Sequence, residues 1–153
     1  MTNTAPHPQG SQRLIDDVSF LLARASALSN AAGNAALAQF GLKVRSYSIL
    51  ELAGDGGRAS QREIADFLRL DPSQVVALVD QLQKAGLVAR EPDQRDRRAN
   101  VIVTTPAGLE TLALARAKVR EATESLHGDL TEIERSTLAD LLRRTAFPAR
   151  QSR

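Results

Sequence analysis

The sequence predicts a mainly α-helical fold with one small β-hairpin, in the order two helices, a helix-turn-helix, a hairpin and two further helices. Three observations predict it. Capping signals divide residues 60–84 into two short helices, and two short aliphatic runs, 87–90 and 100–104, flank a charged stretch. Long helical periodicities precede and follow this region. A helix-turn-helix followed by a hairpin is a winged helix, so we predict a winged helix-turn-helix lobe with additional helices at both ends of the chain.

Length and composition fit one domain of ordinary size. Of the 153 residues, 42% are hydrophobic and 25% charged, and no apolar stretch approaches the roughly 18 residues of a membrane-spanning helix. The chain has no cysteine, which excludes disulfides, thiolate metal sites and thiol-based redox sensing. Its N-terminus lacks a basic segment followed by an apolar one, so we expect no export, no membrane partner and a cytoplasmic location. A net charge of +2 is too small to indicate a partner.

Helical periodicity defines the N-terminal region. Residues 1–10 are polar, with two prolines and a glycine, and we expect a disordered tail. From Ser11 to about Gln39, apolar residues recur at steps of three and four, which predicts one long helix that Gly41 ends. Its second half is rich in small residues, so another element is expected to pack closely against it. Residues 43–53 predict a second, short helix that the run "GDGG" stops.

The helix-turn-helix has the clearest helix start and stop signals in the chain. Ser60 and Glu63 have the spacing of a capping box, and Ile64, Ala65, Phe67 and Leu68 then form an apolar face. Asp71 and Pro72 start a second helix, as N-cap and first helical residue. The positions expected on its buried side are Val75, Leu78, Val79 and Leu82, and Gly86 is expected to end it.

The hairpin and the last two helices complete the expected architecture. We expect the hairpin over 87–104, with a long charged tip. Thr105 and Pro106 predict a helix that runs to about His127, and a capping box at Thr131 and Glu134 starts the last helix. We therefore predict one domain over 11–145, with the winged helix-turn-helix at 43–105, flanking helices at 11–42 and 106–145, and a C-terminal tail at 146–153.

The hairpin tip carries a recognisable pattern of acids and arginines. The pattern Asp93-x-Arg95-Asp96-x-Arg98 follows "VDQLQKAGLV" at 79–88 and precedes the helix start "TPAG" at 105–108. With the order of elements, these residues resemble the MarR (multiple antibiotic resistance regulator) family of bacterial transcription factors, over about residues 11–145. The resemblance implies sequence-specific binding to double-stranded DNA by a homodimeric repressor. It also implies that a small effector, aromatic or phenolic, releases the repressor from a pseudo-palindromic operator.

In this family the hairpin is a wing that reaches DNA. The resemblance gives Arg95, at the tip, a role in the minor groove, where a narrow groove has enhanced negative potential. We expect Arg97 to contact phosphate and count Arg98 with the DNA-binding residues. Asp93 and Asp96 would repel phosphate, so we expect them to pair with Arg95 or Arg98 and fix the shape of the hairpin. The alternative is a solvated charged turn with no role.

The outward face of helix 72–84 is expected to read base edges. The residues on this face are Ser73, Gln74, Ala77, Gln81 and Lys84. The family often has arginine where Ala77 and Gln81 stand. Arginine pairs with guanine, whereas glutamine favours adenine and an alanine methyl can only touch thymine, so we expect less guanine-directed reading here.

The start of the preceding helix is placed for phosphates, because amides at a helix N-terminus favour anions. The residues concerned are Arg58, Ser60, Gln61 and Arg62. Ordinary capping and solvation of these side chains is the alternative.

The long helices at the two ends predict a homodimer. Helices 11–39 and 106–145 hold more apolar surface than a small winged-helix lobe could cover, and a monomer would expose it. In the family, the first helix and the last two form the dimer interface. The alternative is that these helices pack only within one chain.

Nothing in the sequence indicates catalysis, a metal or a cofactor. The two histidines, His7 and His127, belong to no cluster with metal-ligand spacing. No glycine-flanked nucleophile or phosphate-binding loop is present, and "GDGG" lacks a following lysine. We therefore expect a protein that is not an enzyme.

An effector pocket is the least determined feature. The resemblance implies a crevice between the dimer helices and the lobe, and an Arg or Tyr beside Phe would suit an aromatic carboxylate. The candidates are Tyr47, Ser48, Arg45, Phe20, Arg24 and Phe40. The alternative is that Tyr47 and the two Phe residues fill the core. Two further hypotheses stay open, an effector-independent DNA-binding dimer and a winged helix used for protein contacts.

Overall fold

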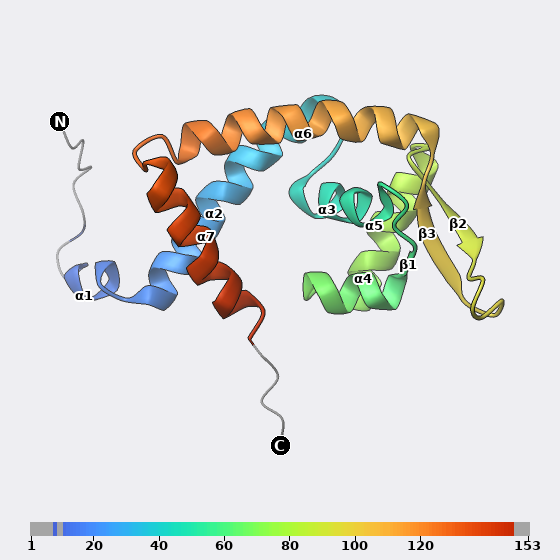
Figure 1. The fold of residues 1–153 in the computed structure, drawn as a ribbon, viewed down its shortest axis with the longest axis horizontal. Helices are drawn as coiled ribbons and strands as arrows, with labels where there is room; N and C mark the ends of the chain where they lie inside the picture. Colours follow the sequence, from blue (N-terminus) through green and yellow to red (C-terminus); the bar gives the residue numbers. More distant parts are fainter. Residues whose placement is uncertain (1–7, 9–10, 149–153) are drawn as a thin grey trace, which may run out of the picture.

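The computed structural model describes Pro8 and residues 11–148, and its elements confirm the predicted fold class. The elements are α1 (Gln12–Ile15), α2 (Val18–Leu37), the 3-10 helix η1 (Ala38–Phe40), α3 (Val44–Ala53), β1 (Ala59–Ser60), α4 (Gln61–Leu68), α5 (Pro72–Lys84), β2 (Val88–Pro92), β3 (Asn100–Thr104), α6 (Pro106–Leu126) and α7 (Glu132–Ala146). The molecule is elongated. A lobe of α3, α4, α5 and the sheet occupies one end, and α6 runs from this lobe to the opposite end, where α7 folds back (Figure 1).

The N-terminal helix is divided, so the prediction of one helix from Ser11 to about Gln39 was wrong. The backbone of Asp17 is extended (φ −88°, ψ 118°), and its carboxylate accepts a hydrogen bond of 2.7 Å from the amide of Phe20. Asp17 is thus the N-cap of α2, and α1 ends two residues earlier. The predicted tail at 1–10 lies outside the described residues except for Pro8, and so do residues 149–153 of the other predicted tail.

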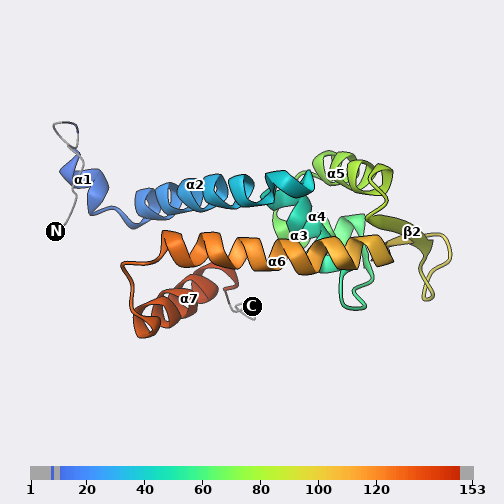
Figure 2. The same ribbon diagram turned by 90° about the horizontal axis from the view of Figure 1, so that it is seen from above.

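Close packing joins α2 to the rest of the molecule. It packs against α6, and the two helices run alongside each other in the view of Figure 2, although α2 diverges from α6 in Figure 1. A Cβ atom added at Gly33 would lie 2.7 Å from Cγ2 of Val44 at the start of α3, so these two helices approach more closely than a side chain would allow. The expectation that another element packs tightly on the second half of this helix is confirmed.

Local capping sets the ends of the lobe helices as predicted. Ser60 accepts a hydrogen bond from the amide of Glu63, and the carboxylate of Glu63 accepts one from the amide of Ser60. Asp71 caps α5, with Pro72 in its first turn. Three residues, 69–71, connect α4 and α5, so the helix-turn-helix is confirmed.

The sheet has three antiparallel strands in the order β1-β3-β2. The predicted hairpin is present, with β2 and β3 paired from Val88 opposite Thr104 to Pro92 opposite Asn100. The two-residue strand β1 was not predicted. It pairs with β3 through Ala59 opposite Ile102 and Ser60 opposite Val101, and so ties the start of α4 to the base of the wing.

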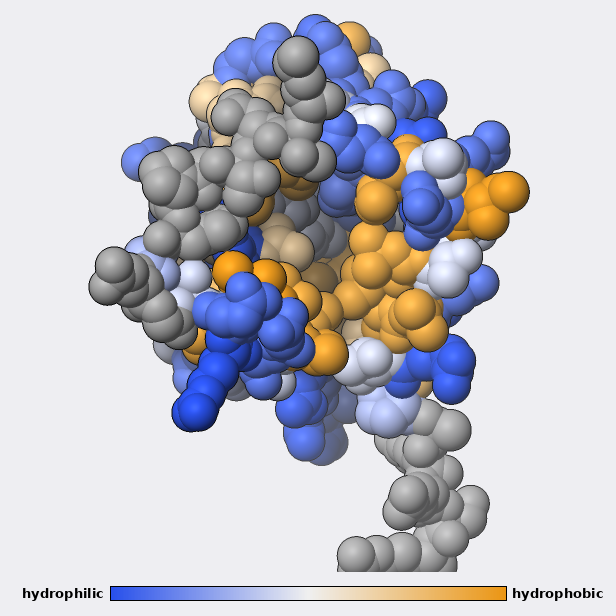
Figure 3. Space-filling model, turned by 90° about the vertical axis from the view of Figure 1, so that its left-hand side faces the viewer, coloured by the Kyte–Doolittle hydropathy of each residue, from blue (hydrophilic) through white to orange (hydrophobic). Residues whose placement is uncertain are grey.

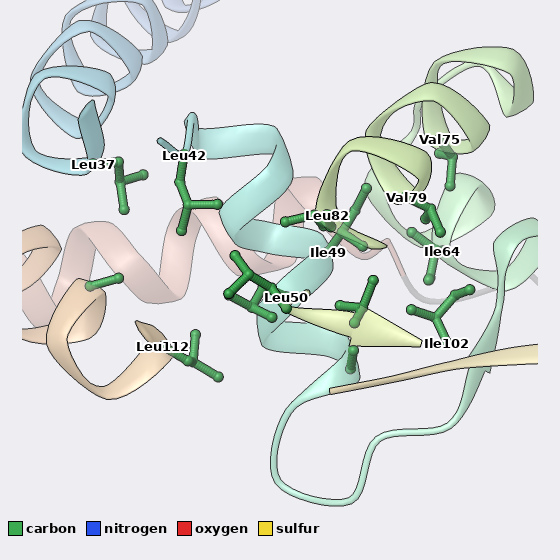
Figure 4. Packing of buried hydrophobic residues seen from close by; sticks show 14 of the residues in the cluster. Leu37, Leu42, Ile49, Leu50, Ile64, Val75, Val79, Leu82, Ile102 and Leu112 are labelled. Carbon is green, nitrogen blue, oxygen red and sulfur yellow. The ribbon is translucent and has the colours of Figure 1, made fainter. Parts of the chain in front are cut away.

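The hydrophobic core lies in the lobe and where the lobe meets α2 and α6. Figure 4 shows its side chains converging from these elements. The largest fully buried ones are Leu37, Ile49, Leu50, Ile64, Ile102, Leu112, Val75, Val79, Val88 and Val101. Phe67, expected on the apolar face of α4, is instead 55% exposed. Its ring lies 5.8 Å, centroid to centroid, from that of Phe147 at the end of α7, so this aromatic pair joins α7 to the lobe.

Candidate nucleic-acid interface

The solvent-facing side of α5 is mostly polar, and few of its side chains form hydrogen bonds within the chain. Val75, Val79 and Leu82 are buried in the lobe, and the opposite side of the helix faces solvent. The predicted base-reading residues Ser73, Gln74, Ala77, Gln81 and Lys84 are all exposed there. The Ser73 hydroxyl donates to the capping carboxylate of Asp71. Within the described part of the chain, the side chains of Gln74, Gln81 and Lys84 make no hydrogen bond, so their donors and acceptors are available to a partner.

The wing tip is organised by its two aspartates. The carboxylate of Asp93 accepts a hydrogen bond of 2.9 Å from the backbone amide of Arg95, and Asp96 accepts one of 3.0 Å from that of Arg98. The amide of Asp93 also bonds the carbonyl of Ala99 across the tip at 2.8 Å. The bond from the amide of Arg95 holds the pKa of Asp93 below its usual value, so this carboxylate stays ionised.

The arginines of the tip project into solvent. The Arg95 side chain is 75% exposed, and its Nε lies 3.5 Å from Asp93, a weak ion pair at most. Arg97 and Arg98 are also exposed. We expected Asp93 and Asp96 to pair with Arg95 or Arg98 and fix the shape of the hairpin. In the structure they fix it chiefly through arginine backbone amides, which leaves the guanidinium groups free to meet an anion.

Arg90, at the base of the wing on β2, joins three elements. Its Nε and one terminal nitrogen donate to Oε1 of Gln61 at 2.9 and 2.8 Å. It also donates to Oδ1 of Asp80 at 2.5 Å and to Oε1 of Gln83. The guanidinium therefore ties the start of α4 and the second half of α5 to the wing. Sequence reasoning missed Arg90 because an arginine next to a charged loop looks solvated, and only the fold brings its partners together.

Arg58, predicted as a phosphate contact, braces the wing from the other side. Its guanidinium forms a 2.9 Å ion pair with Glu91 and donates to the carbonyl of Pro92 at 3.4 Å. Ser60 is engaged in its capping box, whereas Arg62 is exposed. The hydrogen bonds from Ser60 lower the pKa of Glu63. Of the predicted residues at this helix start, Arg58 and Ser60 thus form hydrogen bonds within the lobe, whereas Arg62 faces solvent.

A second charged cluster joins the lobe to α6. Arg116 on α6 donates to both carboxylate oxygens of Glu51, the shortest bond being 2.7 Å, and to Asp55 at 2.7 Å. The Tyr47 hydroxyl donates to Glu51 from within the same helix, α3. Burial and this bond to Glu51 raise the pKa of Tyr47 to about 12, so the phenol is neutral. Bonding to Arg116 lowers the pKa of Glu51.

A groove of about 510 Å³ separates α5 from α2 and the start of α3. Its lining residues are Asn30, Asn34, Lys43, Val44, Arg45, Gln74, Ala77 and Leu78. Of the six residues predicted for an effector, only Arg45 lines this groove. Tyr47 and Phe40 pack against the core, and the hydroxyl of Ser48 bonds the carbonyl of Val44 within α3.

The other two predicted effector residues lie elsewhere. Phe20 and Arg24 are in the first turns of α2, and Phe40 follows the far end of that 20-residue helix, which at 1.5 Å per residue is about 30 Å long. A single chain therefore does not bring the six predicted residues into one cavity.

Between Pro8 and Pro148, over the residues the structure describes, no group of three or more His, Asp or Glu side chains lies close enough to hold a metal ion. Among the described helices, none combines the length and the apolarity needed to cross a membrane.

Comparison with known proteins places this geometry among transcriptional regulators. A family model described as "MarR family" matches residues 40–99. The crystal structure of a MarR-family transcriptional regulator from Rhodococcus sp. RHA1 is 39% identical, with a TM-score of 0.84 over 91% of this chain and 99% of that one. CouR from Rhodococcus jostii RHA1, solved with p-coumaroyl-CoA, is 37% identical, with a TM-score of 0.83 over 93% of this chain and 100% of that one.

Two further matches extend the comparison. A transcriptional repressor, CouR, solved on a 23-mer DNA duplex, is 26% identical, with a TM-score of 0.81 over 93% of this chain and 99% of that one. The HTH-type transcriptional regulator YcgE of Bacillus subtilis is 37% identical over 65% of this chain. The chain spans 62% of YcgE and 59% of a transcriptional regulatory protein of Thauera aromatica that is 32% identical.

Proposed function

We propose that this chain, which belongs to the MarR family of transcriptional regulators, is a transcriptional repressor. It would bind a pseudo-palindromic DNA operator as a homodimer. The observation that carries the proposal is the combination, in one lobe, of an exposed, mostly polar face on α5 and a hairpin whose tip presents exposed arginines. Residues 43–105 would be the DNA-binding lobe. The protein would then act by binding DNA in the cytoplasm, and it would have no catalytic role.

The chemistry of the lobe supports DNA as the partner. An α-helix fits the major groove, where the amides of Gln74 and Gln81 can pair with adenine and Ala77 can touch a thymine methyl. Arg95 is the residue proposed for the minor groove, and Arg97, Arg98, Arg62 and Lys84 for phosphates. The neighbour solved on a DNA duplex, 26% identical, supports the same partner.

The exposed apolar surface supports a homodimer. Figure 3 shows apolar side chains on both sides of a hollow, at the end of the molecule formed by the start of α2 and by α7. The exposed large apolar residues of these two helices are Val18, Leu21, Leu22, Leu28, Ile133, Leu138, Leu141 and Leu142. Helix α7, all of it described, buries none of its residues within the chain. A second copy that covers this surface would bring two lobes to successive major grooves, so 11–42 and 106–145 would form the dimerisation region.

The groove beside α5 supports control by an aromatic effector. Lys43 and Arg45 at its edge suit an anionic group, and Val44 and Leu78 suit an apolar one. The neighbour solved with p-coumaroyl-CoA, 37% identical, makes an aromatic acid or its thioester the class to test first. An effector bound between α2 and α5 would change the separation of the two lobes. A coupling of about 1–3 kcal/mol is enough for a 5- to 150-fold change in DNA affinity.

The DNA proposal is tested at the wing tip. Arg95→Ala should weaken binding to a duplex that the wild-type protein has selected from a random-sequence pool, and the salt dependence should fall by about one unit for each wing. Duplexes with A/T-rich flanks should lose more affinity than those with G/C-rich flanks, because narrow minor grooves attract arginine more strongly. Arg97→Ala, as a phosphate contact, should weaken both alike. Unchanged binding by Arg95→Ala would contradict the proposed role of the wing.

The effector proposal has a separate test. Thermal unfolding with p-coumaric acid and with p-coumaroyl-CoA should show a stabilisation that is reduced in Arg45→Ala. A compound that binds tightly and leaves DNA affinity unchanged would not be an effector in the proposed sense.

A further inference from the structure

Most of the hydrogen-bond donors of the Arg90 side chain are used within the protein. The guanidinium group has five N–H donors and no acceptor. Four donor contacts go to Gln61, Asp80 and Gln83, and the side chain is only 26% exposed. The ion pair with Asp80 offsets its charge. Arg90 is therefore poorly placed to bind DNA itself, although it lies between the three parts of the lobe that would face DNA.

We propose that Arg90 is a positioning residue that turns the side-chain amide of Gln61 so that its NH2 group faces the DNA backbone. The inference rests on the proposed function and adds to it a residue that sequence reasoning did not select. Gln61 is the first residue of α4, next to backbone amides that have no partner within the helix.

The orientation of the amide follows from hydrogen-bond chemistry. A glutamine side chain ends in one acceptor oxygen and one donor NH2 group, and a rotation of half a turn exchanges them. Because Arg90 can only donate, Gln61 must give it the oxygen, and the NH2 group must point elsewhere. Two donors from Arg90 meet this one oxygen, at 2.9 and 2.8 Å, so the exchanged orientation would lose both bonds.

Only one orientation of this amide suits a phosphate. Phosphate oxygens accept hydrogen bonds, so a side chain that meets the DNA backbone must offer a donor. A freely rotating glutamine would offer its oxygen part of the time and would lose rotational freedom on binding. With Arg90 holding the oxygen, the NH2 group is in place before DNA arrives, beside the partnerless amides at the start of α4.

The first test is a double-mutant cycle between Gln61 and Arg90. Gln61→Met keeps an unbranched side chain of similar length without donor or acceptor. Arg90→Lys keeps the charge but cannot reproduce the fork of donors. Fluorescence anisotropy would measure affinity for a duplex that the wild-type protein has selected from a random-sequence pool. Each single variant should bind about tenfold more weakly, as expected for a hydrogen bond to a charged group.

The double variant decides the inference. If Arg90 acts through Gln61, then Arg90→Lys should cost nothing further once Gln61 is Met, and the double variant should bind like Gln61→Met. Two losses that multiply to about 100-fold would overturn the inference, because Arg90 would then act independently, by bracing the wing.

A third variant separates positioning from folding. In Gln61→Glu, a carboxylate can accept the same bonds from Arg90 and lies in the first turn of α4, where negative charge is favourable. Its melting temperature should therefore be equal to or above that of the wild type, while its DNA affinity falls below that of Gln61→Met, because the donor is replaced by a charge that repels phosphate. Wild-type affinity in Gln61→Glu would overturn the inference.

A matched control and a separate outcome complete the design. Gln39→Glu makes the same charge change on η1, where the Gln39 amide bonds only the carbonyl of Ala36, and should leave affinity close to that of the wild type. An equal loss in Gln39→Glu and Gln61→Glu would overturn the inference, since net charge alone would explain it. A wild-type protein that selects no duplex would instead overturn the proposed function.

Discussion

Asp93 and Asp96 contribute to a surface proposed to bind an anion without touching that anion. Each carboxylate bonds the backbone amide two residues further on, a geometry typical of aspartate in tight turns. Charge repulsion alone would make both residues unfavourable beside phosphate. The hydrogen bonds offset this repulsion, because they hold the peptide units that carry Arg95 and Arg98 in one conformation.

The two effects make opposite predictions for Asp93→Ala. If the aspartate holds the tip, its loss should weaken DNA binding by several-fold even though a repulsive charge is removed, since an ordered tip is replaced by many conformations. Fluorescence anisotropy at two salt concentrations would measure this change. Asp129→Ala, which removes the same charge at the turn between α6 and α7, is the control and should bind like the wild type. Tighter binding by Asp93→Ala would mean that the wing is only a charged loop.

At the scale of elements, local signals predicted most boundaries. The caps at Ser60, Asp71, Thr105 and Thr131 mark where α4, α5, α6 and α7 begin, because a cap bonds amides only two or three residues away. The helix break at Asp17 was missed although it is equally local. There the apolar periodicity continues across the cap and hides it.

Features that depend on the fold could not be read from local patterns. Strand β1 has two residues and exists because β3, about 40 positions later, offers it a partner. The groove beside α5 and the bonds of Arg90 likewise combine segments that are distant in the sequence. For the candidate site, the residue types of α5 and the wing could be predicted, whereas the engagement of Arg58 with Glu91 could not.

The joint between α3 and α6 makes a pH prediction. Hydrogen bonds to Arg116 lower the pKa of Glu51 in the folded chain. The ionised Glu51 therefore stabilises the fold at pH values above its ordinary pKa of 4.5, and this stabilisation is lost as the pH falls through the lowered pKa. Glu51→Gln should thus lower the free energy of unfolding by about 1 kcal/mol at pH 7, since the pair is partly exposed. The difference in melting temperature between Glu51→Gln and the wild type should become smaller as the pH is lowered. Glu124→Gln, exposed on α6, is the control. A difference in melting temperature between Glu51→Gln and wild type that stays constant as the pH falls would contradict this account.

The start of α6 makes a packing prediction. A Cβ atom at Gly108 would lie 2.0 Å from the carbonyl oxygen of Leu87, which also accepts a bond of 3.0 Å from the amide of Thr105. Gly108→Ala should force α6 away from the turn after α5 and reduce stability by about 1–3 kcal/mol or more, despite the better helix propensity of alanine. Chemical denaturation would measure it. The neighbouring exchange Ala107→Gly, at an exposed position, should cost about 1 kcal/mol or less, and a Gly108→Ala protein as stable as the wild type would refute the close contact.

At the scale of the whole molecule, buried and exposed apolar residues are distributed unevenly. The core fills the lobe and its junction with α2 and α6, while α7 and the first half of α2 bury almost nothing within the chain. Leu141 is 52% exposed and Ile133 79% exposed, next to other leucines of the same helix. A monomer would therefore present a long apolar face to water, whereas a dimer would use that face to set the distance between two DNA-binding lobes.

Leu141→Glu distinguishes these two possibilities. In a monomer, a charge at this exposed position would change the free energy of unfolding by only a few tenths of a kcal/mol, as is usual for surface substitutions. In a dimer, the carboxylate would be buried without a partner, so the two chains should separate. Light scattering at micromolar concentration should then report half the mass of the wild-type protein. DNA affinity should fall on the order of 100-fold, because the second lobe no longer binds at high effective concentration.

Ser136→Glu is the matched control for this prediction. It adds the same charge to α7 five residues earlier, which at 100° per residue places it on another side of the helix from Leu141. Its mass and DNA affinity should match those of the wild type. If Leu141→Glu also kept the wild-type mass, the apolar face of α7 would not be the dimer interface.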